Sequence, residues 1–449
     1  MAAIRAAQLG AEVHLVEKGA LGGTCLNVGC IPTKAILHVA EMYQILLNGD
    51  ALGIKSDNVR LDWPAVLRYQ KSLVSRLVKG VEGLLKANKV TVHRGHARLK
   101  GSGLVEIDGQ SLEADAVVLA VGSDPFKLSF PGADLAGVID STTALNLPNP
   151  PKSLVVVGGG VIGVEFASMY RSFGTEVTIV EMLPQILSGL DGEIVREVHK
   201  DLVSKGISIV TEAQLEEVRM RGDVLQSRIC QQSHTQELLS EKVLIAVGRS
   251  PCTDKLGLDE AGVFTESGRI LVDEHFLTNL PHVYAIGDCS SRMMLAHVAS
   301  AQGVAAVEHA LGYKAEYFAH IIPACIYIHP EIASVGMTEE EARRQNLDFR
   351  VGKFSLSGNG KALIESGGKG FIKIISGAKY REVLGVHIWG PRATDLIAEA
   401  ALAIRLEATV DELISTIHAH PTVGEAMPEA ALDTDGMTIH WPPGLKKAL

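Results

Sequence analysis

The sequence predicts an α/β fold with two Rossmann-like dinucleotide-binding domains, followed by a C-terminal α+β domain. Two observations predict the dinucleotide-binding domains: a glycine-rich turn between a buried strand and a helix, and an internal repeat of the segment that follows such a turn. Alternating apolar residues in runs such as 371–375 predict an antiparallel sheet near the C-terminus. With 449 residues, the chain is long enough for two to four domains with ample core.

The complete dinucleotide-binding unit is expected at residues 153–181. A buried strand leads into three glycines in G-x-G-x-x-G spacing, and a helix and a second strand follow. The first glycine permits the turn, the second lets a pyrophosphate approach the backbone, and the third allows close helix–strand packing. The alternative is a glycine-rich turn in an unrelated unit. The glycines are Gly158, Gly160 and Gly163, the strands are 153–157 and 176–180, and the helix runs to about residue 173.

The second strand of this unit ends at Glu181, an acid at the distance expected for a ribose-binding carboxylate. A carboxylate there accepts hydrogen bonds from a ribose diol and repels the extra phosphate of NADP. Residues 182–184 are Met-Leu-Pro, so no arginine follows closely to bind that phosphate. The residue therefore favours NAD, and the alternative is an ordinary solvated charge at a strand end.

The segment Gly10–Glu17 repeats Gly174–Glu181 at the glycine, at the following Glu-Val pair and at the terminal Val-Glu. Each segment reads as the end of a helix followed by the second strand of a dinucleotide-binding unit. In the complete copy the third glycine lies eleven residues before Gly174, and the same spacing puts its counterpart two residues before Met1. We therefore expect the first unit to lack its first strand and glycine loop here, and the chain to bind that dinucleotide poorly or to fold poorly.

A pair of cysteines lies near the N-terminus, beside a predicted helix start. Cys25 and Cys30 are close enough in sequence to form a disulfide, and Pro32 suits the first turn of a helix. A helix N-terminus favours a thiolate at Cys30, so the pair is interpreted as a redox disulfide. The alternatives are a structural disulfide and half of a zinc site, but the other four cysteines are isolated and no metal site is expected.

A second chemical motif reads His-Ala-His-Pro-Thr-Val-Gly-Glu from His418 to Glu425. Histidine is the usual general base near neutral pH, and a carboxylate can orient it. Glu425 has a structural alternative, because it stands three residues after a threonine in a capping box. No role is assigned to His418. Pro428 is expected inside the following helix, where it should produce a kink.

The segment from Gly22 to Lys34 resembles the active site of the flavin-dependent pyridine nucleotide–disulfide oxidoreductases. It is most similar to the dihydrolipoamide dehydrogenase branch, and glutathione and mercuric reductases carry close variants. The resemblance implies FAD in the first unit, NAD in the second and redox chemistry at Cys25 and Cys30. It also implies that His420 is the acid/base, contributed by the partner subunit, and that Glu425 is its carboxylate.

The same resemblance implies further cofactor-binding residues. It places a lysine against the flavin and pairs it with a glutamate, although each could be a solvated helix charge. The aspartate that would hold the ribityl chain could instead cap a helix at residues 299–310. These residues are Glu17, Lys34, Gly122, Glu165, Gly248, Asp288 and Ala296.

The family organisation implies four segments: an FAD-binding domain at 1–146, an NAD-binding domain at 147–270, a return segment at 271–316 and a homodimerisation domain at 317–449. The implied activity is oxidation of dihydrolipoamide on the lipoyl domain of a 2-oxo acid dehydrogenase or glycine cleavage complex. Three alternatives remain: another disulfide reductase of this family, a flavin-free non-catalytic dimer, and a simple NAD-binding protein.

Composition limits the partners and the compartment. The net charge of −10 argues against nucleic acid. No apolar run is long enough to cross a membrane, and no signal peptide is recognisable. The expected location is the cytoplasm, or the mitochondrial matrix in a eukaryote.

Overall fold

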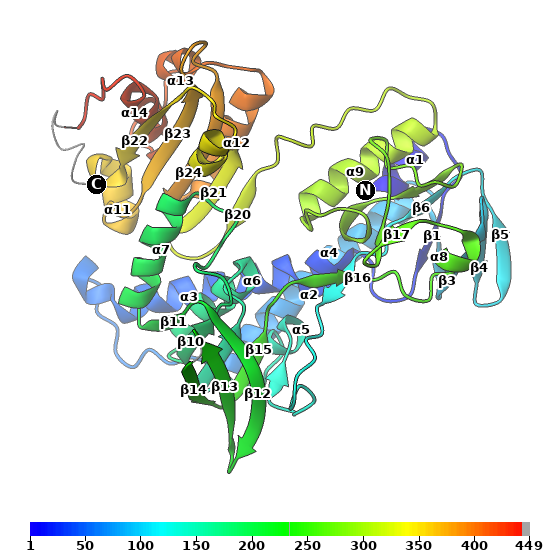
Figure 1. Cartoon of the computed structure of the whole chain (residues 1–449), viewed down its shortest axis with the longest axis horizontal. Coiled ribbons are helices and arrows are strands. Elements are labelled where there is room, and N and C mark those ends of the chain that lie inside the picture. Colours follow the sequence, from blue (N-terminus) through cyan, green and yellow to red (C-terminus); the bar gives the residue numbers. More distant parts are fainter. Residues whose placement is uncertain (233, 442–449) are drawn as a thin grey trace.

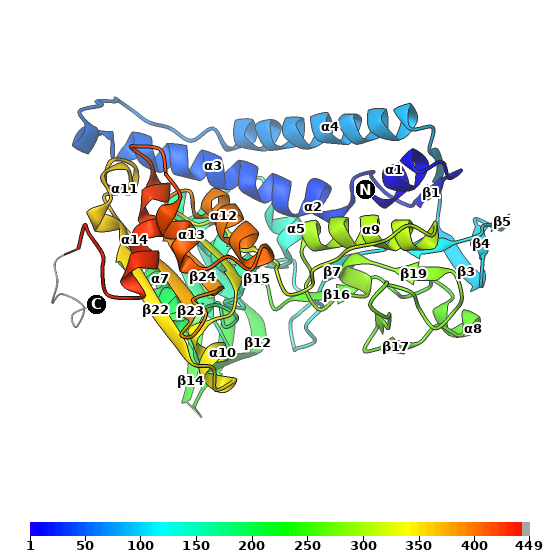
Figure 2. The ribbon, with the colours of Figure 1, turned by 90° about the horizontal axis from the view of Figure 1, so that it is seen from above.

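The computed structural model describes residues 1–232 and 234–441. Three bodies are visible in Figure 1: an N-terminal domain, a second domain that follows it in the chain, and a C-terminal domain packed against the second. Two long helices, α3 (Cys30–Leu47) and α4 (Trp63–Ala87), run side by side along one face (Figure 2). No helix among the described residues has the length and apolar character needed to span a bilayer.

The second domain contains the complete dinucleotide-binding unit. Its five-stranded parallel sheet has the order β11-β10-β9-β15-β8. The predicted strands at 153–157 and 176–180 are both present with the predicted bounds, and the helix between them ends one residue earlier than expected. The elements are β8 (Val138–Ile139), α5 (Ser141–Ala144), β9 (Ser153–Val157), α6 (Val161–Ser172), β10 (Glu176–Val180), α7 (Gly192–Ser204), β11 (Ile207–Val210), β12 (Ala213–Arg221), β13 (Val224–Gln231), β14 (His234–Ser240) and β15 (Lys242–Ile245).

The internal repeat is a structural repeat. Gly10 and Gly174 have the same φ of +93°, a left-handed conformation that glycine adopts without a Cβ clash. Each follows a helix, α1 (Ala2–Gln8) or α6, and each leads into a strand, β1 (His14–Glu17) or β10. The first domain therefore contains the expected second copy of this part of the unit.

The parallel sheet of the first domain is divided. β1 pairs only with β2, β6 pairs only with β19, and no strand among the described residues joins β1 to β6. The expected interruption of this sheet is therefore present in the part of the chain that the structure describes. The remaining elements are α2 (Gly23–Val28), η1 (Gly49–Leu52), β2 (Thr91–Arg94), β3 (Ala97–Gly101), β4 (Leu104–Ile107), β5 (Gln110–Glu113), β6 (Val117–Leu119), β7 (Ser123–Pro125), β16 (Arg249–Pro251), α8 (Leu258–Ala261), β17 (Thr265–Glu266), β18 (Arg269–Ile270), β19 (Val283–Ala285), η2 (Gly287–Cys289) and α9 (Ala296–Ala310).

Two short strands link the expected segments. β8, which lies before residue 147, pairs with β15 of the second domain. β16, which lies before residue 270, pairs with β7 of the first domain. The chain therefore passes between the two sheets in short strands.

The C-terminal domain is built on a five-stranded antiparallel sheet with the order β20-β21-β24-β23-β22, as the alternating runs predict. The inner strand β23 is buried along its whole length, so its lysine also lies in the interior. The elements are β20 (Ala324–Ile326), β21 (Glu331–Gly336), α10 (Glu339–Arg344), β22 (Phe349–Ser355), η3 (Leu356–Gly358), α11 (Gly360–Ser366), β23 (Phe371–Gly377), β24 (Val383–Gly390), α12 (Ala393–Arg405), α13 (Val410–Ser415), η4 (Val423–Glu425) and α14 (Ala426–Asp433).

One apolar core crosses the domain borders. The largest cluster of buried side chains includes Ile36 of α3, Tyr170 of α6 and Phe371 of β23. Because interiors are packed at crystal-like density, these contacts hold the three bodies in one arrangement.

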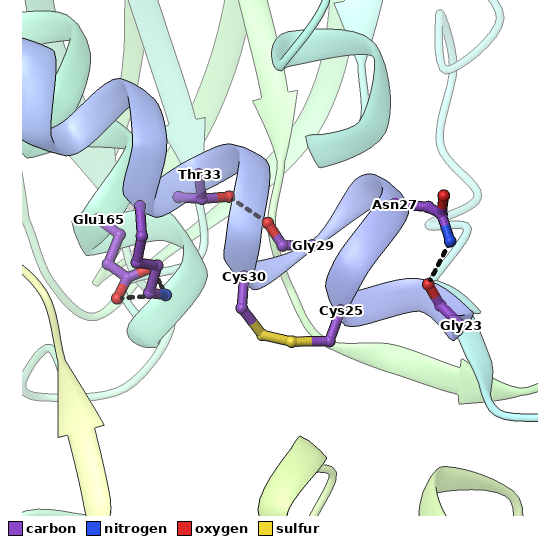
Figure 3. The surroundings of a disulfide bond; sticks show 8 residues. Gly23, Cys25, Asn27, Gly29, Cys30, Thr33 and Glu165 are labelled. Atoms are coloured by element: carbon purple, nitrogen blue, oxygen red, sulfur yellow. Dashed lines mark hydrogen bonds and ion pairs between the residues drawn. A yellow bond between two sulfur atoms is a disulfide. The ribbon is translucent and has the colours of Figure 1, made fainter. Parts of the chain in front are cut away.

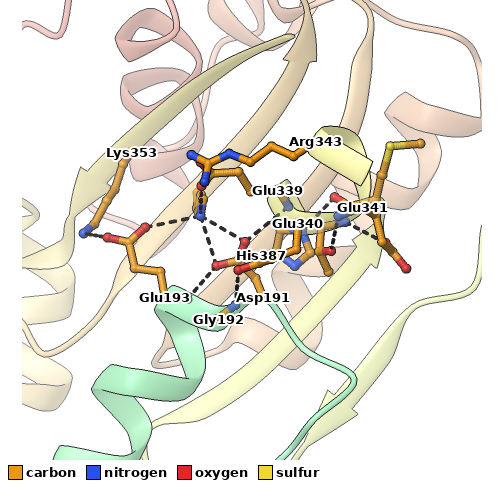
Figure 4. A network of polar contacts seen from close by, with 12 residues as sticks. Asp191, Gly192, Glu193, Glu339, Glu340, Glu341, Arg343, Lys353 and His387 are labelled. Atoms are coloured by element: carbon orange, nitrogen blue, oxygen red, sulfur yellow. Dashed lines mark hydrogen bonds and ion pairs between the residues drawn. The ribbon is translucent and has the colours of Figure 1, made fainter. Parts of the chain in front are cut away.

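A buried cluster of charges joins the second domain to the C-terminal domain (Figure 4). Lys373 of β23 is 1% exposed, and its Nζ lies 2.9 Å from Asp191, 3.3 Å from Glu193 and 2.6 Å from Glu339. Asp191 also caps α7, since its Oδ1 accepts from the Glu193 N–H at 3.0 Å. A buried ion of either sign is strongly unfavourable without such partners.

The pKa shifts of this cluster keep it charged. Burial alone would raise the pKa of Asp191, but the charge and hydrogen bond of Lys373 outweigh burial and lower it. Burial would lower the pKa of Lys373, but Glu339 and Asp191 raise it. The stability from Asp191 is therefore lost as pH falls through its lowered pKa, and that from Lys373 as pH rises through its raised pKa.

We expect Lys373→Met to lower the free energy of unfolding by about 3–5 kcal/mol, because it leaves Asp191 buried without its cation. The matched control is Lys200→Met, which breaks an ion pair with Glu197 in which the lysine is 72% exposed. That change should stay within about 1 kcal/mol. Urea denaturation of both variants tests the prediction, and equal losses would contradict it.

Candidate active site

The predicted disulfide between Cys25 and Cys30 is present (Figure 3), with the Cα atoms 4.7 Å apart. Cys25 lies on α2, a short helix that the sequence did not predict, and Cys30 is the first residue of α3. The helix therefore begins two residues earlier than the expected start at Pro32, which lies in its first turn. The position of Cys30 places its sulfur at the positive end of an 18-residue helix, where a thiolate is stabilised.

Gly29 allows the two cysteines to approach each other. A Cβ at this position would lie 3.0 Å from the Cα of Cys25 and 3.0 Å from the carbonyl oxygen of Thr24. The hydroxyl of Thr33 donates to the Gly29 carbonyl at 2.7 Å and so ties the turn to α3. The glycine is therefore required by close packing between α2 and α3.

The predicted pair of Lys34 and Glu165 is also present, with Nζ 3.0 and 2.8 Å from the two carboxylate oxygens. Lys34 comes from α3 of the first domain and Glu165 from α6 of the second. The glutamate is 4% exposed, so it needs a cation. A third residue, Tyr327, donates its N–H to Glu165 at 3.0 Å and holds its ring 4.6 Å from the Lys34 ammonium.

Tyr327 follows β20 in the C-terminal domain and was not assigned a role from sequence. Its segment was recognised only as part of the interface domain, and an isolated tyrosine carries no signal of its partners. All three domains therefore contribute to the ion pair beside the disulfide.

A single cavity of about 3080 Å³ extends past the disulfide through the first and second domains. Small-molecule sites usually occupy about 300–1,000 Å³, so the cavity has room for more than one large ligand. Both cysteines line it, together with most of the predicted cofactor-binding residues; Gly163 does not. The lining residues from that prediction are Glu17, Lys34, Gly122, Gly158, Gly160, Glu165, Glu181, Gly248, Asp288 and Ala296.

The glycine loop of the second domain has the geometry of a phosphate-binding turn. Gly158 has φ +107°, and a Cβ there would lie 2.4 Å from the Ala246 carbonyl oxygen. A Cβ at Gly163 would lie 1.9 Å from the Gly158 carbonyl oxygen, so this residue permits helix–strand contact. Gly160 has no atom within 4 Å of such a Cβ. The space above Gly160 is open to the cavity, as expected for the position nearest a pyrophosphate.

The two strand-end acids adopt similar arrangements. Glu181 accepts from the Gly159 N–H at 2.6 Å and from the Leu183 N–H at 2.8 Å. Glu17 accepts from the Gly19 N–H at 2.7 Å. These bonds hold each carboxylate at the cavity wall.

Asp288 does not cap the following helix, so that alternative is wrong. It lies in η2, and α9 begins eight residues later at Ala296 with Leu295 as its N-cap. The Asp288 Oδ2 accepts from the Ser123 hydroxyl at 2.5 Å and faces the cavity. The helix also starts three residues before the predicted start, which brings the N-terminus of α9 to the cavity.

Glu425 combines the two roles that the sequence presented as alternatives. Its Oε1 lies 2.9 Å from Nδ1 of His420, and its Oε2 accepts from the Thr422 N–H at 2.9 Å. The Thr422 N–H, followed by His420, lowers the pKa of Glu425, so the carboxylate is ionised. His420 is 83% exposed and does not line the cavity of its own chain.

Pro428 does not lie in the interior of a helix, where the predicted kink would arise. It lies in the first turn of α14, which begins at Ala426. The N–H groups of a first turn have no partner within the helix, so proline removes no hydrogen bond there. The separate turn η4 ends at Glu425. The α-helix begins at the next residue, just before the proline.

The other cysteines near the cavity are protonated thiols. Burial, with Asp124, raises the pKa of Cys252 to about 12, and burial, with Glu331, raises that of Cys325 to about 11. Neither is a nucleophile at neutral pH. In the described part of the chain, no three His, Cys, Asp or Glu side chains are grouped to hold a metal ion.

Comparison with known protein families supports the family expected from the sequence. Residues 1–303 match the family described as pyridine nucleotide-disulphide oxidoreductase, and residues 322–431 match its dimerisation domain. The chain belongs to the pyridine nucleotide-disulphide oxidoreductase family. The family and the fold class expected from sequence are therefore confirmed.

Relatives in this family cover nearly the whole chain. The dihydrolipoyl dehydrogenase of Geobacillus stearothermophilus is 40% identical over 98% of this chain and 94% of its own length. That of Thermus scotoductus is 42% identical over 98% and 95%, and the mitochondrial dihydrolipoyl dehydrogenase 1 of Arabidopsis thaliana is 39% identical over 98% and 89%.

Solved structures of the pyridine nucleotide-disulphide oxidoreductase fold are also similar. LpdA from Mycobacterium tuberculosis has a TM-score of 0.89 at 25% identity, covering 96% of each chain. The HOCl-induced flavoprotein disulfide reductase RclA from Escherichia coli has a TM-score of 0.86 at 26% identity, covering 96% of each chain.

The glycine loop yields a paired prediction. Gly160→Ala meets open space, so we expect a loss of unfolding free energy of no more than about 1 kcal/mol. The added methyl group should still lower NADH affinity by about tenfold or more, because it occupies the phosphate approach. Gly163→Ala should instead destabilise the domain by about 1–3 kcal/mol, because the backbone must shift. NADH titration and urea denaturation separate the two, and identical behaviour would contradict the assignment.

Proposed function

We propose that this chain is a dihydrolipoyl dehydrogenase that oxidises protein-bound dihydrolipoamide with NAD⁺ as acceptor. The observation that carries the proposal is the Cys25–Cys30 disulfide at a helix N-terminus, in one cavity with the glycine loop of the second domain. An exposed imidazole–carboxylate pair, His420 and Glu425, supplies the acid/base that dithiol chemistry needs. Relatives at 39–42% identity are dihydrolipoyl dehydrogenases.

The cavity fits FAD, which is the family's flavin. Glu17 would hold the adenosine ribose, Asp288 the ribityl chain, and Lys34 and the α9 N-terminus at Ala296 the ring. Gly122 and Gly248 have φ of +72° and +121°. They follow β6 and β15, where the chain leaves each dinucleotide-binding unit. When bound, the flavin relays an electron pair between the cysteines and the nicotinamide.

The first chemical step is proton removal from the substrate. His420 of one subunit would take a proton from a thiol of dihydrolipoamide at the disulfide of the other subunit. Glu425 holds Nδ1 of the ring, so Nε2 is the nitrogen available to the thiol. The Glu425 carboxylate stabilises the imidazolium that forms on His420. The Thr422 N–H donates to this carboxylate and stabilises its negative charge.

The second step is thiol–disulfide exchange. The substrate thiolate attacks Sγ of Cys25, breaks the Cys25–Cys30 bond and leaves the Cys30 sulfur as a thiolate at the start of α3. The second substrate thiol then attacks the substrate sulfur of the mixed disulfide, the Cys25 sulfur leaves and takes up the proton of that thiol, and the new sulfur–sulfur bond closes lipoamide. Two electrons have passed from the substrate to the cysteine pair, ready for transfer to NAD⁺.

The acceptor would be NAD⁺ rather than NADP⁺. Glu181 lies at the ribose end of the glycine loop, with its carboxylate fixed by two backbone N–H groups. A fixed negative charge accepts from the ribose diol and repels a 2′-phosphate.

The working unit would be a homodimer that serves lipoyl domains of a 2-oxo acid dehydrogenase or glycine cleavage complex. The match to the dimerisation domain supports the dimer. Relatives from bacteria and from mitochondria support a cytoplasmic location, or the matrix in a eukaryote.

We expect His420→Ala to reduce dihydrolipoamide oxidation by about 10²–10⁴-fold, because the substrate thiol loses its base. NADH-driven reduction of an artificial acceptor should be unchanged, because it bypasses the dithiol. Steady-state assays of both reactions test the role. An equal loss in both would show that the residue acts on folding or on another step.

A separate prediction concerns flavin content. We expect FAD to bind in the cavity that Glu17, Lys34 and Asp288 line. Flavin absorbance against protein concentration measures this. Complete absence of flavin in a stable dimer would contradict it and favour the non-catalytic alternative.

Assays with lipoamide, glutathione disulfide and mercuric ion, each with NADH, distinguish the remaining disulfide reductases. Turnover of glutathione disulfide or mercuric ion above lipoamide would overturn the substrate assignment.

A further inference from the structure

The acid/base motif contains a second histidine that the proposed mechanism does not use. His418 Nε2 lies 2.9 Å from Oε1 of Glu399 on α12, and His418 Nδ1 lies 3.0 Å from the Thr416 carbonyl oxygen. Its side chain is 11% exposed, whereas those of Ile417 and His420 are 98% and 83% exposed. The chain therefore turns His418 inward while its neighbours face outward.

Both partners of the His418 ring are hydrogen-bond acceptors. A carbonyl oxygen and a carboxylate each accept hydrogen bonds, and the two ring nitrogens face one acceptor each. A charge-assisted bond to Glu399 is stronger than a neutral bond. This pair is therefore suited to hold a short segment in place.

The segment it holds has little other support. Residues 417–421 connect α13 to η4 without regular structure. Among the hydrogen bonds of the described residues, the His418–Glu399 bond is the one that joins 417–421 to an element distant in sequence, since His420 bonds to Glu425 in the adjoining η4 and Ala419 accepts from Thr422. The position of His420 thus depends on this contact.

The His418 ring also supports the turn that carries Glu425. A Cβ on Gly424 would lie 3.5 Å from Cδ2 of His418 and 3.5 Å from Leu396 of α12. The ring therefore fills the space between α12 and η4, next to the residue before Glu425.

We propose that His418 and Glu399 form a positioning pair for the acid/base, anchoring residues 417–421 to α12 so that His420 and Glu425 stay aligned. The proposal rests on the proposed function and adds a second imidazole–carboxylate pair behind the first. Misplacement of a reacting group by about 1 Å can cost about 100-fold in rate, so a distant anchor can control turnover.

The test compares three variants and one control. His418→Phe keeps the ring that packs on Gly424 and removes both donors, and Glu399→Leu removes the acceptor. His418→Gln keeps a donor directed at Glu399. The control, His440→Phe, breaks another imidazole–carboxylate pair of the same domain, with Glu429 at 2.8 Å, that lies outside the segment.

We expect His418→Phe and Glu399→Leu to lower kcat for dihydrolipoamide by about 10- to 100-fold with little change in KM. His418→Gln should recover part of the loss. NADH-driven reduction of an artificial acceptor should be unchanged in all variants. Hydrogen–deuterium exchange of residues 416–422 should rise in the first two variants and stay at the wild-type level in His440→Phe.

Unchanged exchange and unchanged kcat in His418→Phe would overturn the proposal, and so would a loss in His418→Phe that Glu399→Leu does not reproduce. The exchange measurement needs no bound flavin and no substrate. If the wild-type chain fails to oxidise dihydrolipoamide, the proposed function fails, while the exchange result still decides whether this pair anchors the segment.

Discussion

The ion pair between Lys34 and Glu165 is the interaction around which the rest of the structure is arranged. The glutamate is almost completely buried and pairs with the lysine at 2.8 Å, and the lysine lies one helical turn after Cys30. Because the two side chains come from different domains, folding of the second domain fixes the helix that carries the disulfide. Tyr327 adds the third domain through its N–H and its ring. The redox centre is therefore placed by all three domains, although both cysteines belong to one.

A second set of buried charges joins the domains at a distance from the disulfide. Lys373 and Asp191 pair across the border between the C-terminal sheet and the start of α7. With the apolar core that runs through Ile36, Tyr170 and Phe371, this cluster prevents the second domain from shifting relative to the C-terminal sheet. The glycine loop and the segment that carries His420 are thus attached to one rigid frame, which chemistry between a bound nucleotide, a disulfide and a base requires.

Elements and motifs whose residues lie close together in the sequence were predictable, whereas contacts between distant segments were not. The strands around Gly158 followed from apolar runs and glycine positions, and the cysteine pair followed from spacing and a proline. The helix α2 was missed because its six residues carry no periodic pattern. Pro428 was misjudged because the boundary between η4 and α14 is set by packing and by the Glu425 cap. Tyr327 and Lys373 have no local pattern at all, because Glu165 and Asp191, to which they bind, lie more than a hundred residues away.

By itself, the sequence determined the family and the two dinucleotide units, and it indicated the residues proposed to carry the redox and acid/base chemistry, because each depends on residue type at short spacing. Only the tertiary structure decided how these residues are held. It showed that one carboxylate, Glu425, serves both His420 and the Thr422 cap, since each oxygen takes one partner. It also showed that His418 faces inward to Glu399 and that polar groups from three domains meet at Glu165. Those arrangements depend on burial and on distances between segments, which no local pattern records.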